Sequence, residues 1–159
     1  WNEVFYSCGN MEMALGDPPD VAGWPQYYKE PSYYELWVNS VTVPVRSSYT
    51  DTYCSNGITK AGFKYIIDPF VLAAMVTNPS DVGILINSYA QVLLPVSLSS
   101  LQLTQLKEVL IPGLPESSWT FEWNKYANNP NDATQKSLVG KKLLALLKAM
   151  LRMPEFYLC

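Results

Sequence analysis

Residues 132–152 read DATQKSLVGKKLLALLKAMLR, and they carry the clearest helical pattern in the chain. Asp132 stands where a helix N-cap would stand, and Gln135 follows it by three residues. Apolar residues then recur at steps of three and four, which places them on one face of a helix: Val139, Leu143, Leu146, Leu147 and Met150. This stripe predicts a helix that Met153 and Pro154 end.

The opposite face of this helix is basic and carries Lys141, Lys148 and Arg152. A basic amphipathic helix can lie on a membrane surface. Here the apolar face contains no aromatic residues and has the pattern of an ordinary core-facing stripe. We therefore favour burial of this face in the protein over contact with lipid.

Start and stop signals elsewhere in the chain predict further helices. They cover residues 1–15, 32–40, 44–54, 69–75, 82–94, 100–111 and 118–128. Asp68, Asp81, Ser99 and Ser118 are the expected caps of the last four. Residues 64–67 are compatible with a short extended piece. With about seven helices, short loops and no alternating strand pattern, the sequence predicts an all-α single domain over residues 1–159.

Two of these helices have an expected buried face. For residues 69–75 we expect it to consist of Phe70, Val71, Ala74 and Met75. For residues 82–94 it consists of Val82, Leu85, Ile86, Tyr89, Val92 and Leu93.

Composition bounds the class of protein. The 159 residues are 48% hydrophobic and 16% charged, which fits one globular domain. The net charge of −3 argues against a nucleic-acid partner. No run of about 18 apolar residues is present, so no membrane span is expected.

Catalytic and metal chemistry has few candidates. The chain has no histidine, so no Ser-His-Asp or Cys-His arrangement can be completed from it. The three cysteines, Cys8, Cys54 and Cys159, form no Cys-x-x-Cys motif, and a Cys8–Cys54 pairing stays open. We expect no catalytic residue, cofactor or metal, and the sequence leans away from an enzyme.

One stretch cannot be a long helix. Residues 16–37 read GDPPDVAGWPQYYKEPSYYELW and contain four of the twelve prolines. The segment is too aromatic for a disordered linker, so an ordered loop is expected. Its rings are candidate ligand-binding residues, because Tyr and Trp combine flat apolar faces with polar edges: Trp24, Tyr27, Tyr28, Tyr33, Tyr34 and Trp37. The favoured alternative is that they pack the loop onto the helices.

Charged residues in and beyond this loop have two interpretations. Asp17 with Asp20, and Glu30 with Glu35, could act as acid–base pairs of a glycosidase. Asp17 and Glu35 also suit helix-boundary positions, and we favour that role. Arg46 lies in the first turn of a predicted helix, where the helix dipole disfavours a cation. It is therefore expected to have a specific carboxylate or carbonyl partner.

The loop and its flanks resemble a known family. Residues 15–25, LGDPPDVAGWP, are followed by Trp37-Val38-Asn39-Ser40 and by Arg46. This arrangement is similar to the C-terminal part of an uncharacterised bacterial family catalogued as domain of unknown function 1800. The "YELW" at residues 34–37 looks like Bacteroides-type members, and the close at residues 153–158, MPEFYL, is similar to the family's ending.

The resemblance covers most of the chain and implies a helix-rich C-terminal fragment of a longer, commonly exported protein. It gives Gly23, Pro25 and Arg46 structural roles, and it carries no catalytic residue. The expected location is the periplasm or cell envelope. Expected partners are the N-terminal part of the longer chain, another envelope protein or a glycan.

Two functions follow as alternatives. In the first, the chain is a non-catalytic helical structural or interaction module of an exported bacterial envelope protein. In the second, it is an accessory part of an enzyme or binding protein that acts on a carbohydrate or cell-envelope polymer, with the aromatic loop as the ligand platform.

Overall fold

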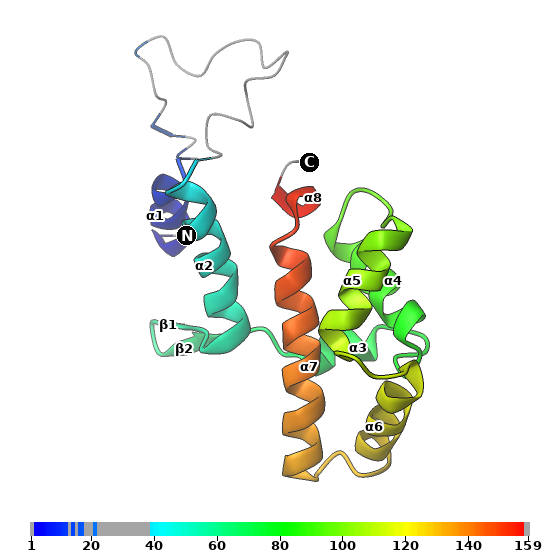
Figure 1. Cartoon of the computed structure of the whole chain (residues 1–159). Helices are drawn as coiled ribbons and strands as arrows, with labels where there is room; N and C mark the ends of the chain where they lie inside the picture. Colours follow the sequence, from blue (N-terminus) through cyan, green and yellow to red (C-terminus); the bar gives the residue numbers. More distant parts are fainter. Residues whose placement is uncertain (1, 13, 15, 18–20, 22–38, 158–159) are drawn as a thin grey trace. The chain divides into compact units, whose positions relative to one another are not determined.

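We describe the protein from a computed structural model, which places residues 2–12, 14, 16–17, 21 and 39–157. These residues form eight α-helices and one two-stranded antiparallel hairpin (Figure 1). The all-α class predicted from the sequence is confirmed. The chain divides into two compact units, Trp1–Thr52 and Tyr53–Cys159.

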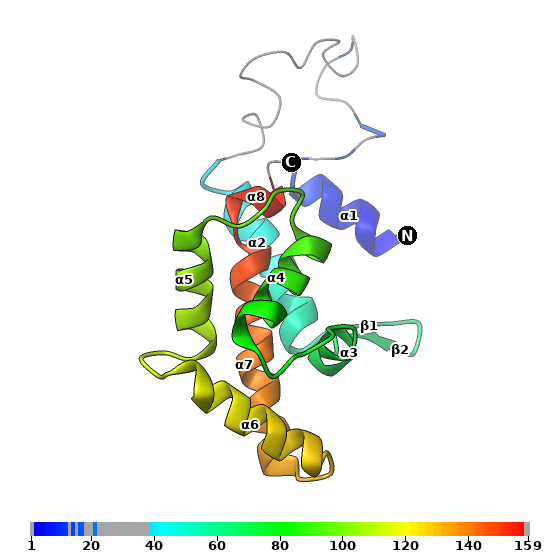
Figure 2. The same cartoon turned by 90° about the vertical axis from the view of Figure 1, so that its right-hand side faces the viewer.

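The longest helix of the second unit is its structural centre. This unit contains α3 (Pro69–Ala74), α4 (Val82–Leu93), α5 (Ser100–Leu110), α6 (Glu116–Asn128), α7 (Ala133–Leu151) and α8 (Pro154–Tyr157). Helix α7 contacts α3, α4, α5 and α6. Figure 1 shows α6 beside the N-terminal half of α7, and Figure 2 shows α5 and α4 in front of α7.

Side-chain caps begin four helices of this unit. Asp68, Asp81 and Asp132 each accept a hydrogen bond from a backbone N–H in the first turn of α3, α4 and α7. Ser99 and Gln102 form a reciprocal capping box at α5. All four caps were predicted from the sequence and are confirmed.

The stripe on α7 lies at the centre of the core. All five of its predicted apolar residues are buried, with exposed fractions of 1% or less. Around them pack buried side chains from α3, α4, α5 and α6: Ala73, Val82, Leu85, Ile86, Tyr89, Leu106, Leu110 and Trp119. Burying apolar surface of this kind contributes about 25 cal/mol per Å² to folding. The core-facing interpretation of the stripe is therefore correct.

Helix α6 is attached by hydrogen bonds as well as by packing. The Trp119 ring is fully buried, and its Nε1 donates to the Pro79 carbonyl at 2.8 Å. The Thr120 hydroxyl donates to the carbonyl of Ser80 at 2.9 Å. The Trp119 and Trp123 rings lie 5.8 Å apart. These bonds join α6 to the loop before α4, forty residues earlier in the chain.

A glycine lets α3 approach α7 closely. A Cβ atom at Gly140 would lie 3.2 Å from Cε2 of the Phe70 ring. The same ring stacks on Tyr126 at a centroid distance of 4.7 Å, and Lys136 Nζ lies 5.6 Å from its centroid. Gly140 therefore leaves room for an aromatic contact between three helices.

The second unit begins within a helix and continues into the hairpin. Cys54, near the end of α2 (Thr42–Ser55), is buried against Leu147 and Leu151 of α7. Nearby, Lys148 Nζ donates to the Ser55 hydroxyl at 2.6 Å. Cys8 and Cys54 do not form a disulfide with each other.

The hairpin consists of β1 (Ile58–Lys60) and β2 (Phe63–Tyr65). Its turn residues, Ala61 and Gly62, have φ values of 50° and 80°. Gly57, with φ of 68°, follows α2, and a Cβ atom there would lie 2.5 Å from the Tyr65 carbonyl oxygen. The predicted extended piece at residues 64–67 corresponds in part to β2. The partner strand β1 was not predicted.

The first unit holds α1 (Asn2–Asn10) and most of α2. The prediction of a helix through residue 15 is wrong, because the chain turns at Glu12, which has φ of 57°. No residue of α1 is buried, and Phe5 is 58% exposed. Helix α2 carries Pro44 in its first turn and stops before Gly57, as predicted.

Three predictions on helix faces and ends need correction. The buried side of α3 carries Ala73, whereas Val71 is 61% and Met75 is 79% exposed. On α4, Val92 is 75% exposed. Helical spacing allowed these residues on the inner face, but where α3 and α4 pack against α7 these side chains remain exposed. Helix α8, after Pro154, was not predicted.

Candidate functional site

The aromatic loop predicted as a binding platform lies outside the described residues. This applies to all six candidate rings, Trp24, Tyr27, Tyr28, Tyr33, Tyr34 and Trp37, and to Gly23 and Pro25. Asp20, Glu30 and Glu35 are also outside, while Asp17 is exposed. The platform and the carboxylate pairs therefore stay predictions.

Apart from Asp17, Arg46 is the one predicted site residue that the described part of the chain contains. Its Nη2 donates to the Met11 carbonyl oxygen at 3.1 Å. The expected carbonyl partner of Arg46 is thereby confirmed. Close by in the same unit, Asn39 Nδ2 donates to Glu12 Oε2 at 3.1 Å. These contacts connect the turn after α1 to the start of α2, which is a structural role.

A hollow in the described surface of the second unit lies between α6 and α7, and we call it the α6–α7 hollow. It has a volume of about 550 Å³, within the usual range of roughly 300–1,000 Å³ for ligand sites. Its lining comes from the loop before α6, from one face of α6 and from the first half of α7: Leu114, Ser117, Ser118, Phe121, Glu122, Lys125, Gln135 and Leu138.

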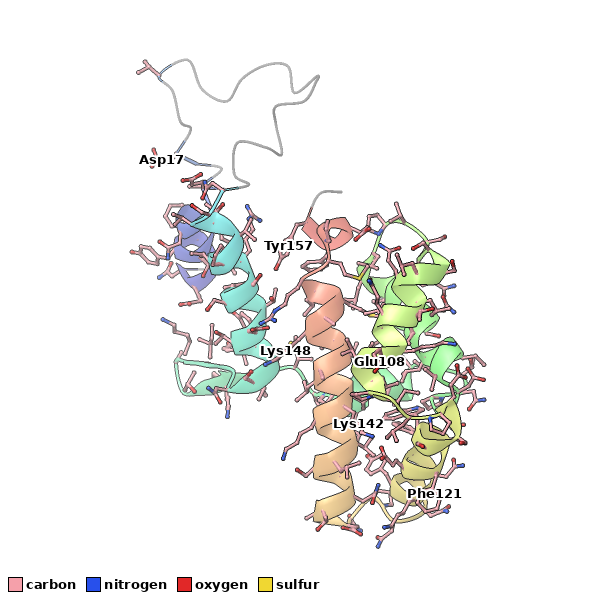
Figure 3. The ribbon with its side chains drawn as sticks, viewed as in Figure 1. Asp17, Glu108, Phe121, Lys142, Lys148 and Tyr157 are labelled. Atoms are coloured by element: carbon pink, nitrogen blue, oxygen red, sulfur yellow. The ribbon has the colours of Figure 1, made fainter. Side chains whose placement is uncertain are left out.

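Helical spacing explains why these residues share a surface. On α6, Ser118, Phe121 and Lys125 follow at steps of three and four, so they lie on one face. On α7, Gln135 and Leu138 are three residues apart and face them. Figure 3 labels Phe121 on α6 and Lys142 on α7.

Apolar side chains in the hollow are exposed to solvent. Phe121 is 69% exposed, Leu114 is 49% and Leu138 is 39%. Single exposed apolar residues are common on protein surfaces. Three large ones around one hollow, with polar groups between them, are the composition of an interaction site.

An ion pair between Glu122, which lines the hollow, and Lys142 lies beside these residues. Lys142 Nζ lies 2.6 Å from Glu122 Oε2 and 2.8 Å from Oε1. Both side chains are about one-fifth exposed, so the pair is partly shielded from solvent. The charge of Glu122 is thereby neutralised by α7, and the pair joins the two helices.

Gln135 adds a buried polar group. The residue is 6% exposed, and its Nε2 donates to the backbone carbonyl of Glu122 at 3.3 Å. Within the described part of the chain, its Oε1 accepts no hydrogen bond. This oxygen is not one of the buried acceptors that lack a partner, so it reaches solvent, and a ligand N–H or O–H can donate to it.

The remaining polar groups of the hollow are also available. Ser118 was predicted to cap α6, but the helix starts at Glu116, and its N-cap, Pro115, makes no side-chain cap hydrogen bond. The Ser117 and Ser118 hydroxyls and Lys125 Nζ have no side-chain partner among the residues the structure describes. They can therefore bind a ligand without first breaking a contact within the protein.

A second, smaller groove lies between α3 and α4. It is lined by Leu72, Met75, Val76, Ser88, Tyr89, Val92 and Leu93, and its volume is about 50 Å³. Burial raises the pKa of the Tyr89 hydroxyl, which donates to the Pro69 carbonyl at 3.4 Å. The groove is too small for a drug-sized ligand and offers few polar groups.

Metal and membrane sites have little support in the described residues. Among residues 2–12, 14, 16–17, 21 and 39–157, no group of three or more Cys, Asp or Glu side chains is placed to hold a metal ion. None of the helices in this part of the chain combines the length and the apolar character that a bilayer crossing requires.

The sequence reasoning missed the α6–α7 hollow. Of its lining residues, only Ser118 and Gln135 were named from the sequence, both at helix starts; α6 also carries the aromatic residues Trp119, Trp123 and Tyr126. A usable signal was Phe121, which stands out of phase with those aromatic residues and therefore has to face elsewhere.

Comparison with protein-family models, with curated proteins and with solved structures finds no match to this chain.

Proposed function

We propose that this chain is a non-catalytic helical interaction module, and that the α6–α7 hollow is its contact surface for a partner. Support comes from one observation above all: three exposed large apolar side chains, Leu114, Phe121 and Leu138, surround a hollow that also contains unpartnered polar groups. An aromatic anchor within a polar surround is the usual composition of a protein-binding surface.

The chemistry of the hollow supports binding more than catalysis. Its carboxylate, Glu122, already pairs with Lys142, so it is not available as a general base. The two serine hydroxyls have no histidine to activate them, because the chain contains none. Electrostatic and apolar contacts are what these residues can supply.

The setting of this module is proposed from the resemblance alone. If the chain belongs with the Bacteroides-type proteins that residues 15–46 and 153–158 resemble, it acts in an exported envelope protein. The partner is then another segment or protein of the envelope.

A second function remains as an alternative proposal. In it the aromatic loop with Trp24 and Tyr28 is a platform for a carbohydrate or envelope polymer, and the chain is an accessory part of an enzyme or binding protein. The composition of residues 16–37 supports it, because Trp and Tyr rings suit flat sugar faces.

The first function can be tested by affinity capture, followed by binding measurements with each captured protein after purification. The tagged full chain is incubated with solubilised envelope fractions of a Bacteroides-type bacterium. Each recovered protein is identified, purified and titrated against the chain. We expect at least one direct complex that Phe121→Asp abolishes and Leu101→Asp preserves, since Leu101 is a comparably exposed α5 residue (66%) outside the hollow.

Two results would count against this function. Turnover of peptidoglycan or a glycan by the chain would contradict a non-catalytic role. Failure of every purified candidate to bind would remove the support for an interaction module. The second function would be favoured if the Trp24→Ala, Tyr28→Ala double variant lost glycan binding while the Phe121→Asp variant kept it.

A further inference from the structure

We propose that the α6–α7 hollow recognises a short peptide segment in which an apolar side chain stands next to an acidic one. This inference rests on the proposed function, because it names the chemical class of the partner. It is carried by the arrangement of apolar, amide and charged groups in the hollow.

The apolar part of the ligand is defined by the lining. Phe121, Leu114 and Leu138 offer one aromatic ring and two branched aliphatic groups, all partly exposed. Aliphatic groups match a Leu, Ile, Met or Phe side chain of a peptide. A sugar ring presents hydroxyls around its edge, and contact with Leu114 and Leu138 would leave some of them without hydrogen bonds.

The amide of Gln135 favours a peptide backbone. Its Nε2 is held by the Glu122 carbonyl, so the side chain is fixed in place although it lines the hollow. Its Oε1 accepts no hydrogen bond from the described residues, and the residue is 6% exposed. A backbone N–H of the ligand can donate to this oxygen, which is open to solvent in the free protein.

The serine hydroxyls supply the complementary half of backbone recognition. Ser118 is half-buried in the first turn of α6, and Ser117 precedes it on the exposed side. Each hydroxyl can donate to a ligand carbonyl, because neither makes a side-chain hydrogen bond within the described protein. The hollow therefore offers both a backbone acceptor and backbone donors.

Charge selects the acidic residue. Glu122 and Lys142 neutralise each other at 2.6 Å, which leaves Lys125 as the uncompensated charge among the lining residues. Lys125 lies one turn after Phe121 on the same face of α6. A carboxylate one or two residues from the apolar anchor can reach its ammonium group, and a cationic ligand would be repelled.

Titration with three defined peptide pools tests the proposal. Each pool contains N-acetylated, C-amidated octapeptides with a central Leu or Phe. The neighbouring position carries Asp or Glu in the acidic pool, Asn or Gln in the neutral pool, and Lys in the basic pool. The ¹⁵N-labelled full chain is titrated with each pool, and chemical-shift changes are followed at the backbone amides.

The expected order of affinity is acidic above neutral above basic. Shift changes should concentrate on residues 114–125 and 135–138. Phe121→Ala should weaken the affinity for the acidic pool by about tenfold, as is usual for an aromatic anchor. Lys125→Gln should weaken the affinity for the acidic pool by about threefold, because exposed charge pairs contribute modestly. The affinity for the neutral pool should not change.

Matched variants control for folding and for general charge. Leu101→Ala removes a comparably exposed apolar side chain on α5, and Lys141→Gln removes an exposed cation of α7 outside the hollow lining. Both should bind all three pools like the unchanged chain. Circular dichroism verifies that each variant keeps its helix content.

Three outcomes would overturn the proposal. The first is equal affinity for the acidic and neutral pools. The second is that the chemical-shift changes are centred outside α6 and α7. The third is that an N-acetylglucosamine tetramer shifts the same backbone amides in a saturable way. The last would assign the hollow to carbohydrate. If a purified envelope partner binds but is unaffected by Phe121→Asp, the interaction module stands while this peptide site is wrong.

Discussion

Helices α7 and α2 are both well-formed, but different forces hold them. Helix α7 has 19 residues, eight of them buried, and its apolar stripe is surrounded by the other helices of its unit. Helix α2 has 14 residues, and its buried residues are Thr42 and Cys54, at its two ends. Its sequence, TVPVRSSYTDTYCS, shows no continuous apolar face.

Local hydrogen bonds replace the stripe in α2. The Asn39 Oδ1 accepts from the backbone N–H groups of Val41 and Thr42 at 2.9 Å each. The Thr50 and Thr52 hydroxyls donate to backbone carbonyls three or four residues earlier. The comparison teaches that α7 depends on burial along its whole length, whereas α2 relies on its Asn39 cap and on contacts of single residues such as Cys54 and Arg46.

The largest effect should come from the centre of α7. Leu143→Ala removes a fully buried side chain, and we expect the free energy of unfolding to fall by about 2–5 kcal/mol because a cavity remains. Val45→Ala, at a half-buried position of α2, should cost less than about 1 kcal/mol. Urea unfolding followed by circular dichroism measures both. Equal losses would refute the contrast between the helices.

Gly57→Ala should disrupt the stop of α2 and the hairpin after it. The new Cβ would lie 2.5 Å from the Tyr65 carbonyl oxygen, and the residue would keep a φ of 68° that L residues rarely adopt. We expect a local cost of about 1–3 kcal/mol. Faster hydrogen exchange of the hairpin amides would show it, with α7 amides as the internal control.

Removing the N-cap side chain of each helix compares how much each helix contributes to global stability. Asp132→Ala and Asn39→Ala each remove a side chain that caps two backbone N–H groups, at a cost of about 1 kcal/mol. For α7 the loss should lower the global stability, because the helix is part of the core. For α2 the loss should appear only as faster hydrogen exchange of the backbone amides in its first turn. A uniform loss of protection in both variants would contradict this.

The smallest effect is a gain in stability. Ala61 has φ of 50°, in the left-handed region that costs an L residue roughly 1–2 kcal/mol. Ala61→Gly relieves this strain but makes the unfolded chain more flexible, so a net stabilisation of the hairpin by under about 1 kcal/mol is expected. Slower exchange of the Lys60 and Phe63 amides tests it.

The parts of the fold predicted well are those with strong local signals. Asp132 and the Leu143 stripe predicted α7 in detail, and Ser99 with Gln102 predicted the start of α5. The carbonyl partner of Arg46 followed from a cation placed at a helix N-terminus. At the two helix starts, residues within a few positions of one another determine the outcome, whereas Arg46 and its partner Met11 are 35 residues apart.

The incorrect predictions depend on distant residues. Which face of α3 is buried depends on Gly140, seventy positions from Phe70, which lets that ring approach α7. Helix α6 begins at Glu116, directly after Pro115, and Trp119 in this helix donates to the Pro79 carbonyl forty residues earlier. The α6–α7 hollow was missed for the same reason, since its two walls meet only after folding.

The place of α7 in the chain has a consequence for synthesis on the ribosome. The residues that it buries in α3, α4, α5 and α6 all precede it in sequence, so they leave the exit tunnel first. Until residues 133–151 emerge, Trp119 and Leu85 lack the helix that covers them. The nascent chain therefore passes through an apolar, aggregation-prone stage, during which a chaperone can bind where α7 later docks.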